Sequence, residues 1–198
     1  MKKIMFNNEY SLTQSVLEGW KTMTRRVIKG KNFIARHWNP VLEPQHCYYK
    51  DERGMCQFID ADTDKIIKPK YEVGEVVAIA QCYRDFYYDE HRSDRMLQYH
   101  PLHKAGWTNK MFVKADLMPY RIRITKVRIQ RLQDISDVDC MAEGINYYEQ
   151  EGFSWCSTGE LFDTPREAFT ALMDKVSGKG TWDSNPFCFV YEFELLNQ

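Results

Sequence analysis

The segment MPYRIRITKVRIQRLQDIS, residues 118–136, carries the clearest strand pattern in the chain. Ile122 and Ile124 share one parity, whereas Val127 and Ile129 share the other. Because successive side chains of a strand point to opposite faces, the apolar positions change face in the middle of the segment. A β-bulge, which adds one residue to one strand of a pair, produces such a change. The segment therefore predicts a long strand with a bulge or sharp bend at its centre.

Two further segments predict strands. VGEVVAIAQCY (73–83) is nearly continuous in apolar residues, which indicates a strand buried on both faces. FCFVYEFEL (187–195) places large apolar residues at every second position, which indicates a half-buried antiparallel strand with Phe187, Phe189, Tyr191, Phe193 and Leu195 on one face. Strands and helices do not alternate regularly, and no glycine-rich phosphate loop follows a strand, so a doubly wound parallel sheet fits poorly.

Three helices are expected between these strands. They begin at Ser11, Ser136 and Thr164, whose hydroxyls are expected to cap the first turn. The first two end at Gly19 and Gly144, and the third ends in the sequence SGKG. Together, these strands and helices predict an α+β fold, which is a small mixed and mostly antiparallel β-barrel with flanking helices.

The length of 198 residues suits one domain, residues 1–198, with insertions. Residues 29–70, approximately, mix prolines, charges and turn signals with short alternating pieces, and we interpret them as an insertion that contains a hairpin. Residues 84–110, approximately, are polar and rich in aromatic side chains without a clear period, which is typical of a long functional or mobile loop.

Composition limits the function classes. The formal net charge of -1 excludes a basic surface over the whole chain but allows a local basic cleft. The 6 cysteines form no C-x-x-C pair and no secretory signal precedes them, which favours reduced thiols and a cytoplasmic protein. No apolar run approaches the ~18 residues of a membrane span. No zinc-type spacing or cofactor motif is present, so neither a metal nor a cofactor is expected.

The segment EGWKTMTRRV (18–27) concentrates cations and hydroxyls, and its composition fits three interpretations. It is a solvated strand, an edge that binds phosphate or another polar ligand, or part of an active site. Lysine and arginine donors together with hydroxyls match anionic oxygens. The candidates for ligand contact in this segment are Thr22, Arg25 and Arg26.

A stronger interpretation pairs Lys21, as base, with Thr24, as nucleophile. A threonine hydroxyl is inert unless a neighbour takes its proton, and lysine does so only when its pKa is lowered. The like charges of Arg25 and Arg26 lower it. A spacing of three residues is wrong for a flat strand and right for a turn or bulge, so this hypothesis requires a bend in the chain.

Glu143 occupies the last position of the second predicted helix, directly before Gly144. Its carboxylate there faces the negative end of the helix dipole, which costs ~0.3–1 kcal/mol at exposed sites. Two interpretations remain open. The side chain is an exposed helix-end glutamate, or it is a buried carboxylate that holds or gives a proton near neutrality.

The strand region 118–136 also carries a run of cations that begins with Arg121 and Arg123. Such a run is most often a solvated outer face. The aromatic residues of the 84–110 loop make contact with single-stranded RNA the functional alternative, because bases stack on aromatic rings.

Four blocks of the chain, in order, resemble ASCH-domain proteins of the type common in phages and prophages. The first resembles the signature G-x-K-T-x-T-R-R, and the last resembles a W-x-x-N-P terminus followed by a strand. The blocks are EGWKTMTRR (18–26), VGEVVAIAQCY (73–83), MPYRIRITKVRIQRLQDISDVDCMAEGI (118–145) and GKGTWDSNPFCFVYEFEL (178–195).

The resemblance implies a PUA-like β-barrel with a cleft between barrel and helices, and an RNA or nucleoside ligand. Some short ASCH proteins hydrolyse N4-acylated cytidines with a lysine, a threonine and a glutamate, and others are reported to cleave RNA. The matching positions here are Lys21, Thr24 and Glu143. The leading hypothesis is a cleft that binds RNA or a modified nucleoside, with metal-independent amide hydrolysis as the enzymatic form. The alternatives are a non-catalytic RNA-binding module, an RNA-cleaving enzyme, and a phage accessory protein with a vestigial cleft.

Overall fold

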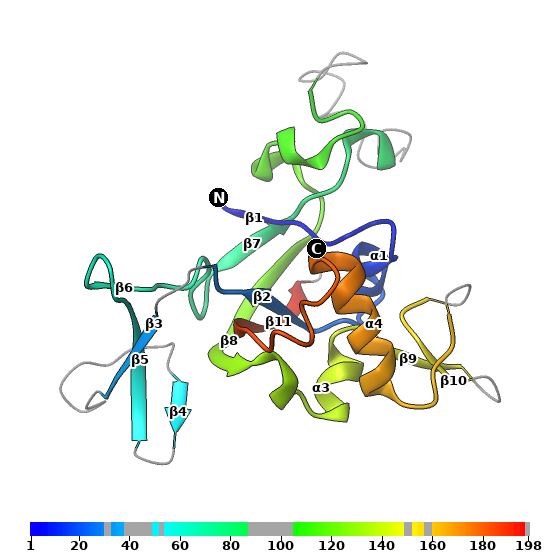
Figure 1. The fold of residues 1–198 in the computed structure, drawn as a ribbon. Coiled ribbons are helices and arrows are strands. Elements are labelled where there is room, and N and C mark those ends of the chain that lie inside the picture. The colour runs from blue at the N-terminus through cyan, green and yellow to red at the C-terminus, as the bar shows by residue number, and fades with distance from the viewer. Residues whose placement is uncertain are drawn as a thin grey trace.

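The structure is a computed structural model, which describes residues 1–29, 33–37, 49–51, 54–86, 105–148, 152–156 and 160–196. These residues form an α+β fold with few helices and mostly antiparallel sheets, as the sequence predicted (Figure 1). In the part of the chain that the structure describes, no helix is long and apolar enough to cross a membrane.

In the described residues the main sheet has five strands in the order β1-β7-β8-β11-β2. Within this described sheet β1 and β7 pair in parallel, and the other neighbours are antiparallel. The strands are β1 (Lys3–Ile4), β7 (Val76–Ile79), β8 (Arg121–Arg131), β11 (Phe187–Leu196) and β2 (Met23–Val27). The two long strands β8 and β11 thus form the centre of the sheet, and β2 lies at one edge.

The predicted bulge in β8 is confirmed. Lys126 pairs with Glu192 and Ile124 pairs with Phe193, so Thr125 between them has no partner in β11. The extra residue brings the apolar positions on both sides of it to the same face, and Val127 is 3% exposed on that face.

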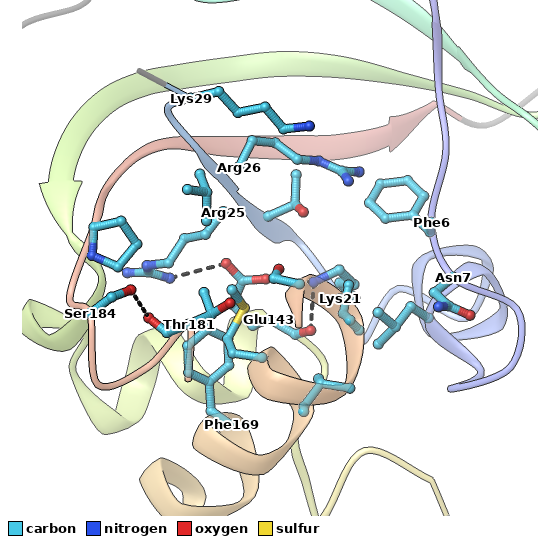
Figure 2. A pocket seen from close by; sticks show the side chains of 18 residues that line it. Phe6, Asn7, Lys21, Arg25, Arg26, Lys29, Glu143, Phe169, Thr181 and Ser184 are labelled. Carbon is cyan, nitrogen blue, oxygen red and sulfur yellow. Dashed lines mark hydrogen bonds and ion pairs between the residues drawn. The ribbon is translucent and has the colours of Figure 1, made fainter. Parts of the chain in front are cut away.

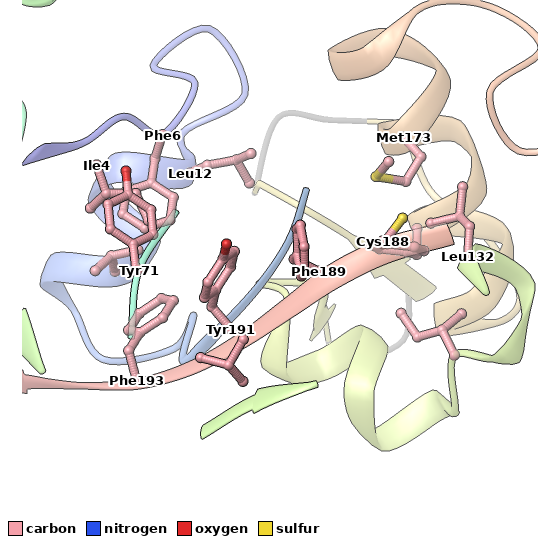
Figure 3. Packing of buried hydrophobic residues seen from close by; sticks show 14 of the residues in the cluster. Ile4, Phe6, Leu12, Tyr71, Leu132, Met173, Cys188, Phe189, Tyr191 and Phe193 are labelled. Atoms are coloured by element: carbon pink, nitrogen blue, oxygen red, sulfur yellow. The ribbon is translucent and has the colours of Figure 1, made fainter. Parts of the chain in front are cut away.

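Strand β11 is more deeply buried than its alternation predicted. Phe193 and Tyr191 lie on one face, where they pack against Phe6 and Tyr71 at ring-centroid distances of 5.7 and 5.4 Å (Figure 3). Cys188 is on the other face, yet it is also fully buried, beside side chains of the flanking elements. The expectation of a half-buried strand is therefore wrong for the middle of β11, because helices cover its second face. The expectation that β7 is buried on both faces is confirmed, since Val77, Ala78 and Ile79 are all fully buried.

The helices are α1 (Leu12–Leu17), α3 (Asp137–Ala142) and α4 (Pro165–Ser177). Ser136 and Thr164 cap α3 and α4 as predicted, each accepting a hydrogen bond from the backbone N–H three residues on. Ser11 does not cap α1: its φ of 55° is left-handed and its side chain makes no capping bond. Gly144, with φ 99°, allows the turn that ends α3.

The predicted barrel is not closed by hydrogen bonds in the described residues, where the ladder runs from β1 to β2 and no strand pairing joins these two edges. Side chains bridge the gap instead. Arg26 of β2 donates a hydrogen bond of 2.5 Å to the carbonyl oxygen of Met5, just after β1. Its guanidinium lies 5.9 Å from the centroid of the Phe6 ring. We call this junction between the two edges the seam.

The predicted insertion at 29–70 contains a second sheet rather than a single hairpin. Its order is β3-β5-β4, with β6 paired to β5. Phe58 is 2% exposed and packs on Phe187 of the main sheet at 4.6 Å, which anchors the insertion. The strands are β3 (Phe33–His37), β4 (Tyr49–Asp51), β5 (Gly54–Asp60) and β6 (Lys65–Ile66).

The middle of the second predicted insertion, residues 87–104, lies outside the described residues. On its two sides lie short 3-10 helices, η1 (Tyr83–Asp85), η2 (Lys110–Phe112) and η3 (Ala115–Leu117). Another, η4 (Leu132–Asp134), links β8 to α3, and the hairpin β9 (Asn146–Tyr148) and β10 (Gly152–Ser154) follows α3.

Candidate functional site

A pocket of about 530 Å³ opens at the seam (Figure 2). Its walls come from the chain after β1, from β2, from the end of α3 and from one face of α4. The residues that line the pocket include Phe6, Asn7, Lys21, Thr24, Arg25, Arg26, Lys29, Glu143 and Phe169. The structure thus brings the predicted catalytic residues Lys21, Thr24 and Glu143 to one pocket, together with Arg25 and Arg26.

Lys21 and Glu143 form a buried contact in this pocket. The Lys21 ammonium donates to Glu143 Oε2 at 2.7 Å and to the Glu143 backbone oxygen at 2.6 Å. Their side chains are only 2% and 5% exposed. The cation therefore satisfies both the carboxylate and a carbonyl at the negative end of α3, which removes the unfavourable dipole contact expected for Glu143. Of the two interpretations of Glu143, the buried carboxylate is the one observed.

Backbone contacts hold Lys21 in this position. Its N–H donates to the Ser15 carbonyl in α1, and the N–H of Thr22 donates to the Ala142 carbonyl at the end of α3. Gly144 lies directly below, where an added Cβ would sit 3.4 Å from Lys21 Cβ. The segment before β2 is thus pinned between the ends of two helices.

Arg25 completes the buried network. Its guanidinium donates to Glu143 Oε1 at 3.1 Å and to Asp139 Oδ2 at 2.7 Å, and its side chain is fully buried. It also lies 5.9 Å from the Phe169 ring of α4. Gln130 accepts a further hydrogen bond at 3.1 Å. Among the described residues Arg25 Nε has no hydrogen-bond partner.

Asp139 extends the network to the surface of the sheet. The same Oδ2 atom accepts from Arg128 at 2.9 Å, and Arg128 also contacts Glu192. Asp139 was not a candidate from the sequence, and Arg128 was one only as a member of the run of cations in the 118–136 strand region. The sequence did contain an indication that Asp139 belongs to the site: it precedes Glu143 by four residues, so the two side chains lie on the same face of α3.

Thr24 lies in the pocket without joining this network. Arg25 points to α3 and α4, so its neighbour Thr24 belongs to the opposite face of β2, with Arg26. Thr24 is 5% exposed. Among the described residues its hydroxyl has no hydrogen bond to Lys21 or to another group. The direct hydrogen bond between Lys21 and Thr24 that the hypothesis requires is therefore not formed in the described residues.

Burial lowers the pKa of Lys21. The Glu143 carboxylate opposes this shift, and the charges of Arg26 and Arg25 add smaller contributions in the lowering direction. The direction matches the sequence-based expectation, although removal from water, and not the two arginines, is its main cause.

This lowered pKa predicts a pH dependence of stability. Between the folded-state pKa and the ordinary lysine pKa of 10.5, the unfolded chain binds more protons at Lys21 than the folded chain does. The Lys21 contribution to the free energy of unfolding therefore rises with pH across that interval and is constant below it. Urea unfolding from about pH 7 to about pH 10 should show wild type gaining stability relative to Lys21→Met.

The comparison with Lys21→Met is needed because other groups titrate in the same range. Burial raises the pKa of the thiols of Cys140 and Cys188 to about 12, which acts in the opposite direction. Both proteins share these thiols, so their contribution cancels in the difference. A difference that is flat, or that favours the variant at high pH, would contradict a lowered pKa for Lys21.

Three predicted ligand contacts lie outside the pocket. Thr22 is exposed. Arg121 and Arg123 belong to β8 and do not line the pocket. Arg123 pairs with Glu194 at 3.3 Å, and Lys126 pairs with Glu192 at 3.6 Å. Arg123 and Lys126 of β8 thus face acids on β11, which favours the interpretation of this part of the run as a charge-balanced outer face.

No group of three or more metal-ligating side chains occurs among the described residues. Cys82, Cys140, Cys156 and Cys188 are free thiols. Comparisons with family models, curated proteins and solved structures find no match to this chain. The feature that indicates a function is therefore the pocket, which offers buried donors and one carboxylate beside a hydroxyl and two aromatic rings.

Proposed function

We propose that the pocket at the seam binds RNA or a modified nucleoside. The observation that carries the proposal is that Lys21, Thr24 and Glu143 line one pocket, although Glu143 lies 122 residues after Lys21 in the sequence. A base needs a small number of fixed donors and acceptors together with apolar walls. Lys21 and Glu143 supply the donors and acceptors, and Phe6 and Phe169 supply the apolar walls.

The proposal includes a place among ASCH-domain proteins, with a PUA-like barrel that opens at the seam. Its support is the position of the blocks that resemble that family. EGWKTMTRR runs into β2, the 118–145 block ends at α3 and Glu143, and the last block forms β11, which pairs with β2. Three of the four blocks therefore form or support the walls of the pocket. A single domain in the cytoplasm is part of the same proposal.

In its enzymatic form, the pocket hydrolyses the amide of an N4-acylated cytidine. The amine of Lys21 takes the proton of Thr24, and Thr24 Oγ1 bonds to the acyl carbon, whose carbonyl oxygen becomes an oxyanion held by a nearby donor. The carbon–nitrogen bond then breaks, and the proton that Lys21 took from Thr24 passes through the Glu143 carboxylate to the departing N4 amine. Water hydrolyses the acyl-threonine ester, which releases the carboxylic acid and restores the hydroxyl.

One observation favours a second candidate, a non-catalytic binding module. Lys21 donates to two Glu143 oxygens, and in the described residues it makes no hydrogen bond to Thr24. Catalysis requires a shift of Lys21 or Thr24 when the ligand binds, whereas recognition of a base requires none. The two functions share the pocket and differ in whether a product forms.

The experiment is a calorimetric titration of the full chain with N4-acetylcytidine and with a short single-stranded RNA, followed by chromatographic analysis for cytidine and acetate. Binding with product supports the enzyme, and binding without product supports the module. Shortened RNA products would favour RNA cleavage instead. Absence of binding to both ligands would contradict the proposal and favour an accessory protein that acts through a protein partner.

A further inference from the structure

The cations of the pocket fall into two groups that differ in their partners. Lys21 and Arg25 lie deep in the pocket and share the Glu143 carboxylate, with Asp139 behind them. Arg26 and Lys29 also line the pocket. In the described residues neither of these two has a carboxylate within ion-pair distance. We call Arg26 and Lys29 the cationic rim.

The rim side chains are available to a ligand. Lys29 is exposed and Arg26 is partly exposed. Figure 2 shows the ends of both side chains on the same side of the pocket, above the Lys21–Glu143 pair and next to Phe6. Arg26 uses one N–H for the Met5 carbonyl, which fixes its guanidinium over the Phe6 ring and leaves its other donors for a ligand.

The positive charge of Arg26 reaches two neighbouring lysines. Burial is the main cause that lowers the pKa of Lys110, and Arg26 acts on it in the same direction. The same holds for Lys21. In the described residues the two cations of the rim have no carboxylate partner, whereas Lys21 and Arg25 pair with Glu143. The rim is therefore a region of positive potential beside a deep pocket in which the charges are nearly balanced.

We propose that the cationic rim binds a phosphate group of the ligand, so that a nucleotide or an RNA phosphodiester is preferred over a free nucleoside. This inference rests on the proposed function. The nearly neutral interior receives the uncharged base, and the two unpaired cations receive the negative oxygens, which arginine and lysine bind through charge-assisted hydrogen bonds. In nucleic-acid recognition, likewise, one set of contacts is made to the bases and a separate set is made to the phosphates.

The test compares the affinity of the full chain for cytidine, for cytidine 5′-monophosphate and for a short oligocytidylate at low salt. The phosphate is expected to improve affinity by about tenfold or more. Arg26→Gln/Lys29→Gln should abolish that advantage. Lys126→Gln/Lys175→Gln removes two exposed cations outside the pocket and should leave the advantage unchanged. Lys29→Gln alone gives a partial loss and avoids any effect on the Arg26–Met5 contact.

The outcomes separate the two proposals. Equal affinity for the nucleoside and the nucleotide overturns the phosphate assignment and leaves the proposed function intact. Binding of none of the three ligands contradicts the proposed function, and the phosphate assignment falls with it. A preference for the oligonucleotide over the mononucleotide identifies the RNA backbone as the source of the phosphate, and its salt slope should fall by about 1 for each rim cation removed.

Discussion

Replacement of Glu143 by alanine is expected to lower the free energy of unfolding by about 3–5 kcal/mol, because it removes one partner of a buried ion pair. Lys21 would keep only the backbone carbonyl as acceptor, and Arg25 would keep Asp139. Both cations are almost completely shielded from water, so water cannot replace the lost carboxylate without a rearrangement of the site. Urea unfolding followed by circular dichroism measures this change.

Two variants make the result specific. Glu194→Ala removes a glutamate from an exposed pair with Arg123, where both side chains are about half exposed, and should cost less than ~1 kcal/mol. Lys21→Met/Glu143→Leu removes both charges of the buried pair and should cost less than Glu143→Ala alone, since no unpaired lysine remains. A double variant that is less stable than Glu143→Ala, or similar losses for the two glutamates, would contradict a buried ion pair at this position.

Replacement of Thr24 by valine is expected to reduce turnover of N4-acetylcytidine by about 10³-fold or more, if the pocket is an enzyme. Valine keeps the shape and the β-branched side chain of threonine, so the pairing of β2 with β11 is preserved. The affinity for the ligand should change far less than turnover, because the hydroxyl serves the chemical step and not the recognition of the base.

The matched control is Thr22→Val, which removes the hydroxyl of an exposed threonine two residues before Thr24, just outside β2. It should leave turnover unchanged. Equal turnover by wild type and Thr24→Val would contradict Thr24 as nucleophile. Absence of turnover in wild type together with retained binding would instead identify the pocket as a non-catalytic binding site.

The sequence was sufficient to predict the elements whose pattern is local. The parity change between Ile124 and Val127 predicted the bulge in β8, and Thr164-Pro165 predicted the start of α4. The sequence was not sufficient where surrounding elements determine the burial or the backbone conformation of a residue. The alternation in β11 did not reveal that helices cover its second face, and Ser11 adopts a left-handed backbone that prevents it from capping α1.

The candidate site shows the same division. Residue types and the ASCH resemblance selected Lys21, Thr24 and Glu143, and these three line one pocket. The partners of Arg25 were not predictable, because its contacts with Asp139 and Gln130 depend on how α3 packs against β8 and β2. The two hydroxyls and the cations of GWKTMTRR also lie in different environments. Strand parity indicated that they point to different faces of the strand, but it did not show which environment each face meets.

The most direct test of the central claim is a chemical-shift titration of ¹⁵N-labelled protein with a single-stranded oligoribonucleotide that carries one N4-acetylcytidine. Binding at the seam predicts the largest shifts for backbone amides at the pocket, at Phe6, Thr24, Arg26 and Glu143. The outer face of β8 around Arg123 should change little, because its cations are already paired with β11. Shifts confined to β8, or no shifts at all, would contradict the pocket at the seam as the site that binds RNA or a modified nucleoside.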